Sequence, residues 1–311
     1  MDGRKAVREL YEKSHTPSMR ERAEGPGIKM KKFHNNVKRQ LIYQFAWGAP
    51  CLLDLCCGRG GDLQKWYDAK VRYVKGIDIA AASIEEAQRR YIQLSTQQGA
   101  YKPSNRSQPQ PRQQPNSRQY RQPSPPPTFK VDFLVSQQLG REVLFAEDVG
   151  RYEAISCMFA LHYFFESESI LDCFLRTVGR CLKRGGHFLG CCPDGARIAA
   201  LLGDQEHYED SVVRLTKLWR GERSACGSAY GVSVLDTVIE GRSEEYLVDF
   251  EYLAGKAAQH GLFPVSQFTP SLQGMLEGKE YYKHFKPNWG LGYREWEQYS
   301  RMNAVFVFRK S

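Results

Sequence analysis

The stretch that decides the fold is Cys51-Leu-Leu-Asp-Leu-Cys-Cys-Gly-Arg-Gly-Gly-Asp62. A short apolar run ends in a glycine-rich turn, and residues 62–69 after it have the pattern of a helix. The sequence therefore predicts a strand, a tight turn and a helix in succession. In sheets built from such units, a ligand binds beyond the carboxyl ends of the strands, near the first glycine-rich turn.

The alternation of strand and helix continues along the chain. Further strands are predicted at 73–78, 129–134, 154–159, 187–192, 263–268 and 304–308, and helices at 83–94, 170–182 and 244–260. Ser83 and Glu86 have the spacing of a capping box at the start of the helix over 83–94. Strands separated by helices at this spacing favour an α/β fold with a doubly wound, mostly parallel sheet.

Two segments differ in composition from the rest of the chain. Residues 1–32 carry nine Lys and Arg against five acids, and residues 95–128 carry five Lys and Arg with no acid. The second segment also holds eight of the 15 prolines and lacks Val, Ile, Leu and Phe, so it is predicted to be a disordered insertion. We expect a basic flexible tail over 1–32 and a single domain over 33–311. Attraction to a polyanion would concentrate in the two basic segments.

Several protein classes are excluded by the sequence. No run approaches the ~18 apolar residues of a membrane span, and the first residues have no apolar signal core. The nine cysteines are an odd number and include adjacent pairs inside apolar runs, so we expect reduced thiols. No Cys or His spacing fits a zinc site, and no metal is predicted. The chain is expected in the cytosol or nucleus.

The residues around the turn point to a nucleoside-containing cofactor. Gly58, Gly60 and Gly61 let a ligand approach the backbone, and Asp78 ends the following strand. A carboxylate there can accept both hydroxyls of a ribose. Because an Asp-Leu-Cys-Cys run precedes the first glycine, the turn departs from the G-x-G-x-x-G pattern of dinucleotide sites. The sequence therefore favours S-adenosylmethionine over a dinucleotide.

The stretch over 54–66, D-L-C-C-G-R-G-G-D-L-Q-K-W, resembles the D-L-G-C-G-K-G-G-D-L-x-K-W signature of eukaryotic mRNA cap guanine-N7 methyltransferases. Further blocks follow in the family's order: F-H-N-N-V-K at 33–38, G-I-D-I-A at 76–80, L-H-Y-F-F-E-S at 161–167, G-G-H-F-L-G at 185–190, E-E-Y-L-V at 244–248 and R-E-W-E at 294–297. The resemblance implies a Rossmann-like class I S-adenosylmethionine-dependent methyltransferase with insertions. It also implies methyl transfer to N7 of the cap guanosine of GpppN-RNA, in the nucleus.

The resemblance implies a set of cofactor contacts. Lys38 would pair with the methionine carboxylate, and Asp78 would hold the ribose. The predicted cofactor-binding residues are Lys38, Asp54, Cys56, Gly58, Asp78, Ile79, Met158 and Tyr163. Asp54 either touches the cofactor or orients the turn through backbone N–H groups.

This sequence departs from the family at several of these positions. Cys56 stands where the family has a glycine, and Met158 where it has a glutamine. The family's adenine-side aspartate has no clear match, and Asp132 is the nearest acid. The late tyrosine of the cap pocket is also absent at its usual offset, where Asn303 falls closest and Tyr299 is an alternative.

The resemblance also implies a cap pocket, roofed by an insertion at about 203–242. The predicted cap-binding residues are Asn35, Arg59, His162, Tyr163, Pro193, Glu245 and Asn303. Guanine N1–H and N2–H₂ form a two-donor edge that the Glu245 carboxylate can meet bidentately. Taken alone, Glu245 also fits a solvated carboxylate in the first turn of a helix. No catalytic base is predicted, because N7 carries a free lone pair and positioning suffices.

Expected partners are capped RNA, together with capping-apparatus proteins or an activating subunit, and neither a membrane nor DNA. Two other functions stay open on the sequence. One is an N-methyltransferase of a small molecule or a protein, since the fold does not decide the substrate. The other is a non-catalytic RNA-binding homologue in which Cys56 and Met158 have weakened the cofactor site.

Overall fold

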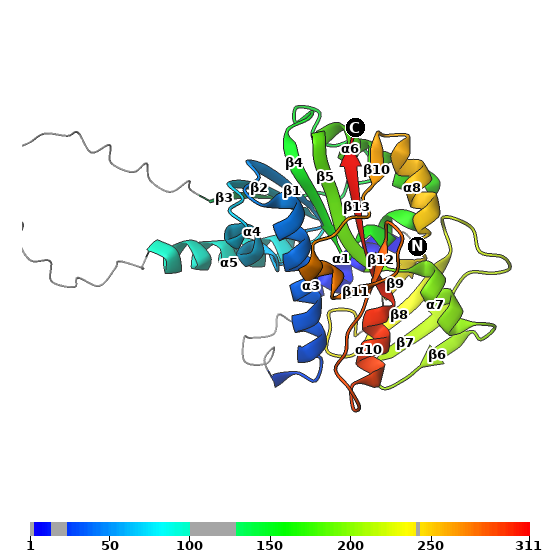
Figure 1. Cartoon of the computed structure of the whole chain (residues 1–311). Helices are drawn as coiled ribbons and strands as arrows, with labels where there is room; N and C mark the ends of the chain where they lie inside the picture. Colours follow the sequence, from blue (N-terminus) through cyan, green and yellow to red (C-terminus); the bar gives the residue numbers. More distant parts are fainter. Residues whose placement is uncertain (1–2, 14–23, 100–128, 241–242) are drawn as a thin grey trace, which may run out of the picture.

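A computed structural model describes residues 3–13, 24–99, 129–240 and 243–311 (Figure 1). Its centre is a sheet in the order β11-β12-β13-β5-β4-β1-β2-β3. Five of these strands run parallel: β1 (Cys51–Leu55), β2 (Tyr73–Asp78), β3 (Lys130–Val135), β4 (Tyr152–Met158) and β5 (Leu182–Pro193). The prediction of a doubly wound, mostly parallel sheet is confirmed.

The other edge of the sheet is antiparallel. Strand β13 (Asn303–Lys310) pairs with β5 and places Asn303 opposite Pro193. The short strands β10 (Leu262–Pro264), β11 (Leu276–Glu277) and β12 (Lys283–Phe285) complete this edge. The strand predicted over 263–268 is thus reduced to β10.

A second, antiparallel sheet lies beyond the carboxyl ends of the parallel strands (Figure 1). It consists of β6 (His207–Glu209), β7 (Val213–Lys217), β8 (Ala229–Val234) and β9 (Ser243–Tyr246). Most of it comes from the predicted insertion over 203–242. This sheet therefore stands where a ligand of the parallel sheet is expected.

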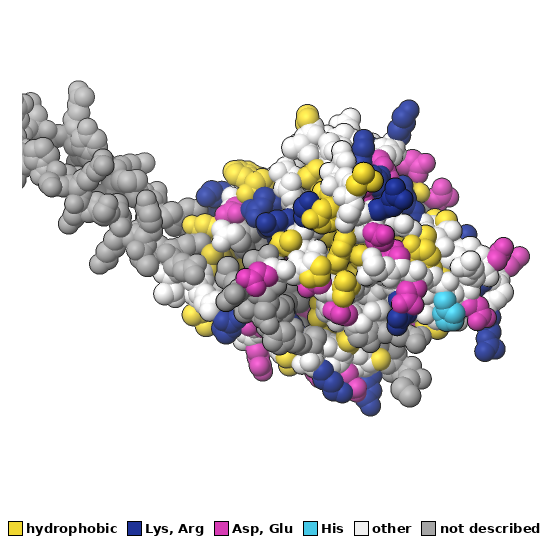
Figure 2. Space-filling view, turned by 90° about the horizontal axis from the view of Figure 1, so that it is seen from below, with side chains coloured by type: hydrophobic (Ala, Val, Ile, Leu, Met, Phe, Trp, Pro, Cys, Tyr) yellow, Lys and Arg dark blue, Asp and Glu magenta, His cyan; other side chains and the backbone are white. Residues whose placement is uncertain are grey.

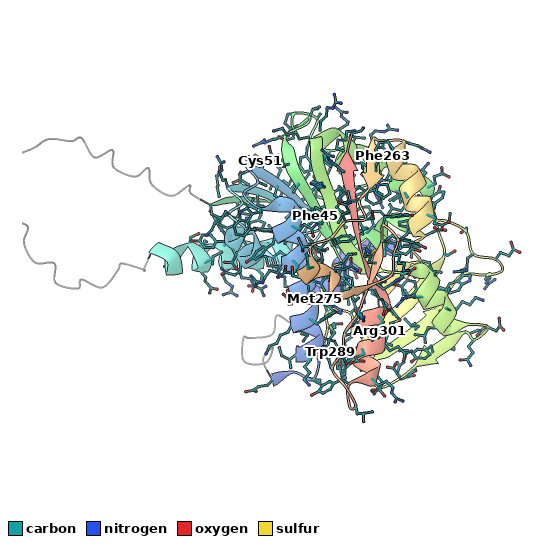
Figure 3. All side chains as sticks on the ribbon, in the orientation of Figure 1. Phe45, Cys51, Phe263, Met275, Trp289 and Arg301 are labelled. Atoms are coloured by element: carbon teal, nitrogen blue, oxygen red, sulfur yellow. The ribbon has the colours of Figure 1, made fainter. Side chains whose placement is uncertain are left out.

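Helices lie against the central sheet and against the second sheet. They are α1 (Gly3–Lys13), α3 (Ile28–Ala46), α4 (Leu63–Asp68), α5 (Ala81–Gly99), the 3₁₀ helix η1 (Leu161–Glu166), α6 (Glu168–Cys181), α7 (Gly195–Leu202), α8 (Phe250–Ala258), α9 (Pro270–Gln273) and α10 (Arg294–Arg301). Helix α3 lies against the C-terminal elements, where Phe45 packs edge-on against Phe268 at 6.0 Å and Asn36 contacts Met275 (Figure 3). No helix among the described residues is long and apolar enough to span a bilayer.

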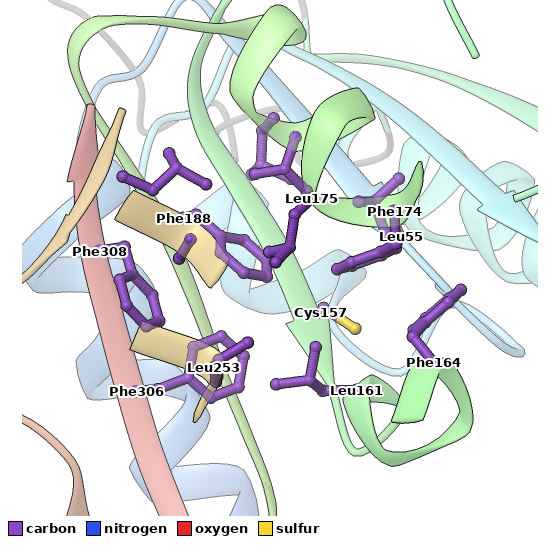
Figure 4. Packing of buried hydrophobic residues seen from close by; sticks show 14 of the residues in the cluster. Leu55, Cys157, Leu161, Phe164, Phe174, Leu175, Phe188, Leu253, Phe306 and Phe308 are labelled. Atoms are coloured by element: carbon purple, nitrogen blue, oxygen red, sulfur yellow. The ribbon is translucent and has the colours of Figure 1, made fainter. Parts of the chain in front are cut away.

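The apolar core lies on both faces of the sheet. Phe188 of β5 and Phe306 of β13 pack with Phe174 of α6 on one face (Figure 4). The rings of Phe164 and Phe174 stack at 4.0 Å, which joins η1 to this core. Each such buried side chain contributes about 1.5–3 kcal/mol. The core thus holds η1 rigidly at the end of β4.

On the outer surface, basic and acidic side chains are both spread over the face drawn in Figure 2.

The helix predicted over 244–260 is wrong at its start. Ser243–Tyr246 is strand β9, and α8 begins only after Asp249, whose side chain accepts from the N–H groups of Glu251 and Tyr252 at 3.0 Å. Along β9 the residues alternate between buried and exposed, which is the period of a strand. Glu245 is therefore not a first-turn helical carboxylate.

Three smaller predictions also fail. Helix α5 begins at Ala81, so Ser83 is a buried position within the helix and not its N-cap. The segment predicted as a flexible tail contains α1 and the beginning of α3. The helix predicted to end near residue 94 continues to Gly99. The rest of the predicted insertion, residues 100–128, lies outside the described residues.

Candidate active site at the carboxyl ends of the parallel strands

Two neighbouring cavities open at this end of the sheet. The larger measures about 1110 Å³ and the smaller about 60 Å³. Consecutive residues of η1 divide between them, because His162 lines the larger cavity and Tyr163 the smaller. Strand β9 does the same, with Glu245 on the larger cavity and Glu244 on the smaller. The two cavities therefore share a wall made of η1 and β9.

Asp78 is the acid of the smaller cavity. It ends β2, and its carboxylate accepts from the N–H of Gly58 at 2.8 Å and of Ala80 at 3.0 Å. Burial raises the pKa of Asp78, while these backbone hydrogen bonds favour the charged form. Ile79, which the sequence predicts as a cofactor residue, lines the same cavity. The turn and the carboxylate thus hold each other in position.

The backbone of the turn is left-handed at several residues. Cys56 has a φ of 66° and Gly60 a φ of 67°. A Cβ on Gly60 would lie 2.8 Å from the Leu63 side chain and 3.3 Å from the backbone of Ala87, so only glycine fits there. Cys56 pays for this conformation, which costs about 1–2 kcal/mol for a residue with a Cβ. Cys56 is also one of the residues that line the smaller cavity.

A buried cluster with more positive than negative charge lies beside the turn. The ammonium groups of Lys38 and Lys65 both lie 2.8 Å from Asp62 Oδ1. Although burial opposes it, the two lysines hold the pKa of Asp62 well below its usual range. Lys65 also donates to Asn35 Oδ1 at 2.8 Å, and Lys38 lines the larger cavity. Two ammonium groups on one carboxylate leave a positive charge that can accept an anion.

Asp54 lies behind the cavities. It is buried in β1, lines neither cavity, and accepts a hydrogen bond from the hydroxyl of Ser156. Burial, reinforced by the charge of Asp62, raises the pKa of Asp54 to about 8. The hydrogen bond from Ser156 thus ties Asp54 of β1 to β4.

Glu245 is the acid of the larger cavity. Its Oε2 accepts from the hydroxyl of Tyr230 at 2.6 Å, and its Oε1 lies 3.5 Å from His162 Nε2. Burial lowers the pKa of His162 in spite of this neighbour, so the imidazole is neutral. Among the described residues, neither ring nitrogen of His162 has a hydrogen-bond partner. A charged acceptor and two uncommitted ring nitrogens thus face the same space.

The remaining predicted residues divide into those on the cavities and those away from them. Asn35, Arg59, Pro193 and Asn303 line the larger cavity. Met158 instead packs in the core and lines neither cavity. Of the predicted cap residues, all but Tyr163 line the larger cavity, at the carboxyl ends of the strands.

The nearest acid to the missing adenine-side aspartate does not lie at the site. Asp132 accepts from the hydroxyl of Tyr73 at 3.0 Å on the outer part of the sheet. Ser136 and Gln137, just after β3, line the smaller cavity instead. The polar side chains at this end of β3 are therefore the uncharged Ser136 and Gln137, and not an aspartate.

Several residues of the site were not predicted from the sequence. Helix α1 covers both cavities, with Val7 on the smaller one and Tyr11 on the larger. The Arg59 guanidinium donates to the carbonyl of Tyr11 at 3.4 Å, and burial raises the pKa of Tyr11 to about 12. Tyr230 and Arg90 line the larger cavity as well. The short apolar pattern of α1 was the signal in the sequence that could have predicted this helix. It was overlooked because residues 1–32 are basic in composition.

Comparison with protein families gives the context for this geometry. The model of the mRNA (guanine-N(7))-methyltransferase domain matches residues 1–311. The chain belongs to this family. Among curated members, it is 31% identical over 180 residues to the mRNA cap guanine-N(7) methyltransferase of Drosophila melanogaster, covering 54% of this chain and 37% of that one. It is 32% identical over 203 residues to mRNA cap guanine-N(7) methyltransferase 1 of Oryza sativa. That match covers 65% of this chain and 49% of the rice protein.

The match with the yeast relative covers nearly the whole of this chain. The Saccharomyces cerevisiae mRNA cap guanine-N(7) methyltransferase is 28% identical over 333 residues, covering 98% of this chain and 69% of that one. The chain spans less than half of the length of the Drosophila and rice relatives. Family members therefore carry additional segments beyond the part that this chain matches.

Solved structures support the fold. The CcbJ methyltransferase from Streptomyces caelestis superposes with a TM-score of 0.53 at 13% identity, covering 98% of this chain and 96% of that one. An S-adenosylmethionine-dependent methyltransferase from Clostridium acetobutylicum superposes with a TM-score of 0.50 at 13% identity. That match covers 91% of this chain and 92% of the Clostridium chain. The fold is that of class I Rossmann-like methyltransferases, as the sequence predicts.

Proposed function

We propose that this chain transfers a methyl group from S-adenosylmethionine to N7 of the cap guanosine of GpppN-RNA. The observation that carries the proposal is the pair of cavities that share a wall of η1 and β9, with Asp78 on one side and Glu245 on the other. A methyl transferase needs its donor and acceptor in adjoining pockets with the reacting atoms aligned. Membership of the cap methyltransferase family agrees with this arrangement.

The residues of the smaller cavity fit the cofactor. The carboxylate of Asp78 suits the ribose diol, and the apolar side chains of Ile77, Ile79 and Leu139 suit a flat adenine. The methionine carboxylate is suited by the excess positive charge of Lys38 and Lys65, which reaches the larger cavity through Lys38. S-Adenosylmethionine supplies an electrophilic methyl group on a sulfonium.

The larger cavity fits a guanine. Glu245 is held by Tyr230, so its carboxylate is fixed in orientation before the base arrives. Its oxygens can accept from N1–H and N2–H₂, an edge that adenine lacks. Loss of such a hydrogen-bonded match costs about 10⁴-fold or more in discrimination.

The reaction requires no proton transfer by the protein. Guanine N7 attacks with its own lone pair, and the neutral His162 serves to bind the base. Alignment of the acceptor with the donor can supply about 7–11 kcal/mol of the barrier. The methylated base becomes cationic, and the buried Glu245 carboxylate stabilises the developing charge.

The larger cavity also offers groups for the polyphosphate of a capped RNA. Arg59, Arg90 and Lys32 line it, and a cap bridge carries several negative charges beside the base. Capped RNA is therefore the proposed partner, and the nucleus the proposed place of action. Contacts with capping-apparatus proteins or an activating subunit belong to the same proposal.

The decisive experiment is methyl transfer from tritiated S-adenosylmethionine to unmethylated GpppA-capped RNA. Nuclease digestion then identifies the labelled position, which we expect to be N7 of the cap guanosine. Label on free metabolites or proteins in place of capped RNA would assign the chain to another N-methyltransferase reaction.

A second function is favoured by one observation. Cys56, at a position where the family's turn has a glycine, lines the smaller cavity together with Val7 of α1. A non-catalytic RNA-binding homologue would show no heat of binding with S-adenosylhomocysteine up to millimolar concentration. Measurable binding would reject this function.

A further inference from the structure

Two cysteines meet at the turn that borders the smaller cavity. Cys56 follows β1, is half-buried and is one of the residues that line this cavity. Cys157 belongs to the neighbouring strand β4 and is fully buried. Cys56 packs against the apolar cluster that contains Cys157, and a hydrogen bond joins the two side chains. The chain therefore places a thiol at the cavity beside a second thiol in the core.

The register of the sheet gives the spacing of the two backbones. Asp54 of β1 pairs with Ser156 of β4. Cys56 lies two residues beyond this pair and Cys157 one residue beyond it, so the two are offset by one residue across neighbouring strands. With strands about 4.8 Å apart and a rise of about 3.3 Å per residue, the two Cα atoms are expected about 6 Å apart. Disulfides join Cα atoms that are about 4.4–6.8 Å apart, so this pair has the spacing of a disulfide.

The thiol of Cys56 is kept in spite of a strained backbone. Its φ of 66° lies in the left-handed region, which a glycine adopts without strain. Strain at the edge of a cavity is typical of residues with a function. Because a glycine would form the same turn at lower cost, the turn alone does not explain this cysteine. The feature that the side chain adds is its thiol group.

The two thiols have different surroundings. Burial raises the pKa of Cys157 well above its usual range, so this thiol stays protonated at neutral pH. Cys56 is the member of the pair that a small oxidant in the cavity can reach. Redox-sensing pairs have this arrangement, in which an accessible cysteine reacts first and a neighbouring cysteine resolves the product.

We propose that Cys56 and Cys157 form a reversible disulfide that weakens cofactor binding when the protein is oxidised. The oxidant is a hydroperoxide such as hydrogen peroxide. The Cys56 sulfur takes one peroxide oxygen to form a sulfenic acid, and the other oxygen leaves as water. The Cys157 thiol then attacks the sulfenic sulfur, and the S–S bond forms as the remaining oxygen leaves as water. Two thiols thus lose two electrons, and one peroxide is reduced to two waters.

The bond acts on the cofactor cavity through the turn. Gly58, two residues after Cys56, donates its N–H to Asp78 of β2 at 2.8 Å. Because β1 lies between β4 and β2, a link from Cys56 to β4 draws the turn away from Asp78. We expect affinity for S-adenosylhomocysteine to fall about tenfold, the effect of one lost hydrogen bond to a charged group. This effect on the cofactor rests on the proposed function, whereas formation of the disulfide does not.

The test is oxidation of the full chain with hydrogen peroxide in the absence of ligand. Mass spectrometry of non-reduced peptides should find a pair linked through Cys56 and Cys157, which dithiothreitol separates. Calorimetry then compares the oxidised protein with the same sample after reduction. The oxidised form should bind S-adenosylhomocysteine about tenfold more weakly, and reduction should restore the affinity.

Two variants separate this pair from the other cysteines. Cys56→Ser should abolish both the linked peptide and the effect of peroxide on affinity. Cys51→Ser is the matched control, because Cys51 is also half-buried and lies on β1 but lines neither cavity. It should oxidise and lose affinity as the unchanged protein does.

Three results would overturn the inference. In the first, the linked peptide joins Cys57 or Cys192 in place of the pair. In the second, peroxide converts Cys56 to unlinked acids that dithiothreitol does not reverse. In the third, the disulfide forms but affinity for S-adenosylhomocysteine is unchanged. If the reduced protein itself binds no S-adenosylhomocysteine, the cofactor site of the proposed function fails, and with it the effect of the disulfide on that site.

Discussion

Tyr230 and Glu245 stand directly opposite each other in the pairing of β8 with β9, and the tyrosine hydroxyl donates to Glu245 Oε2 at 2.6 Å. Both side chains are almost fully buried. A carboxylate so far from water requires a donor, since its desolvation is costly. The insertion that carries Tyr230 is therefore more than a cover for the cavity, because it also orients the acid.

Removal of that donor tests the relationship. Tyr230→Phe should raise the KM for GpppA-RNA about tenfold, since a hydrogen bond to a charged group is lost. The measurement is steady-state methyl transfer at saturating S-adenosylmethionine. Tyr208→Phe is the matched control, because Tyr208 donates to Asp210 at 2.8 Å in the same sheet but lines neither cavity. An equal effect of both changes would contradict a specific role for Tyr230.

Glu245→Gln tests the acid itself. The substitution keeps the size of the side chain but replaces one acceptor oxygen with a donor, which faces the guanine donors. We expect kcat/KM on GpppA-RNA to fall by at least about 100-fold. Affinity for S-adenosylhomocysteine, measured by calorimetry, should not change, because Glu245 does not line the smaller cavity. Equal losses in both measurements would remove Glu245 from the cap pocket.

Asp78→Asn tests the ribose contact. The amide nitrogen would oppose the N–H groups of Gly58 and Ala80, which now donate to the carboxylate. We expect affinity for S-adenosylhomocysteine to fall at least about tenfold. Asp132→Asn is the control, since this acid bonds Tyr73 and lies off both cavities. The assignment fails if Asp132→Asn weakens cofactor binding as much as Asp78→Asn does.

Cys56→Gly tests the departure from the family turn. Because Cys56 has a φ of 66°, glycine should raise the free energy of unfolding by about 1 kcal/mol. Removal of the side chain from the smaller cavity should also tighten S-adenosylhomocysteine binding several-fold. Lys70→Gly is the control, since Lys70 has a φ of 61° on the surface and lines neither cavity. It should stabilise the fold with no change in affinity. Weaker binding by Cys56→Gly would show that the thiol contributes to the site.

The pH dependence of stability tests Asp54. Burial raises its pKa to about 8 in the folded protein, above the usual value of 3.8. The folded state therefore binds the proton more tightly than the unfolded state, and this contribution is lost as pH rises through 8. Asp54→Asn lacks the titration, so its Tm relative to wild type should increase from pH 5 to pH 8.5. The measurement is thermal unfolding without ligand. Parallel curves for the two proteins would contradict the raised pKa.

The predicted part of the site consists of residues whose surroundings are local in sequence. The turn over 56–62 follows β1 directly and Asp78 ends β2, and parallel strands align their carboxyl ends at one edge. For that reason the turn and Asp78 could be placed together from the sequence. The family resemblance added His162 and Glu245, whose positions no local pattern indicates.

The strand β9 shows why other elements could not be predicted. Five residues around Glu245 fit both a helix and a strand, because a short run does not separate a period of 3.6 from a period of 2. Pairing with β8 decides for the strand and turns Glu245 inward beside Tyr230. Such pairing depends on segments that meet only in the folded chain.

The amino-acid order alone thus determined the parallel sheet, its glycine turn and the acid that follows it, because each depends on neighbouring residues. Only the tertiary structure decided that α1 lines both cavities and that the Tyr230 hydroxyl holds Glu245. These features arise from contacts between segments far apart in sequence, such as that of Arg59 with the Tyr11 carbonyl. Packing of the whole chain brings those groups together, and no local periodicity encodes it.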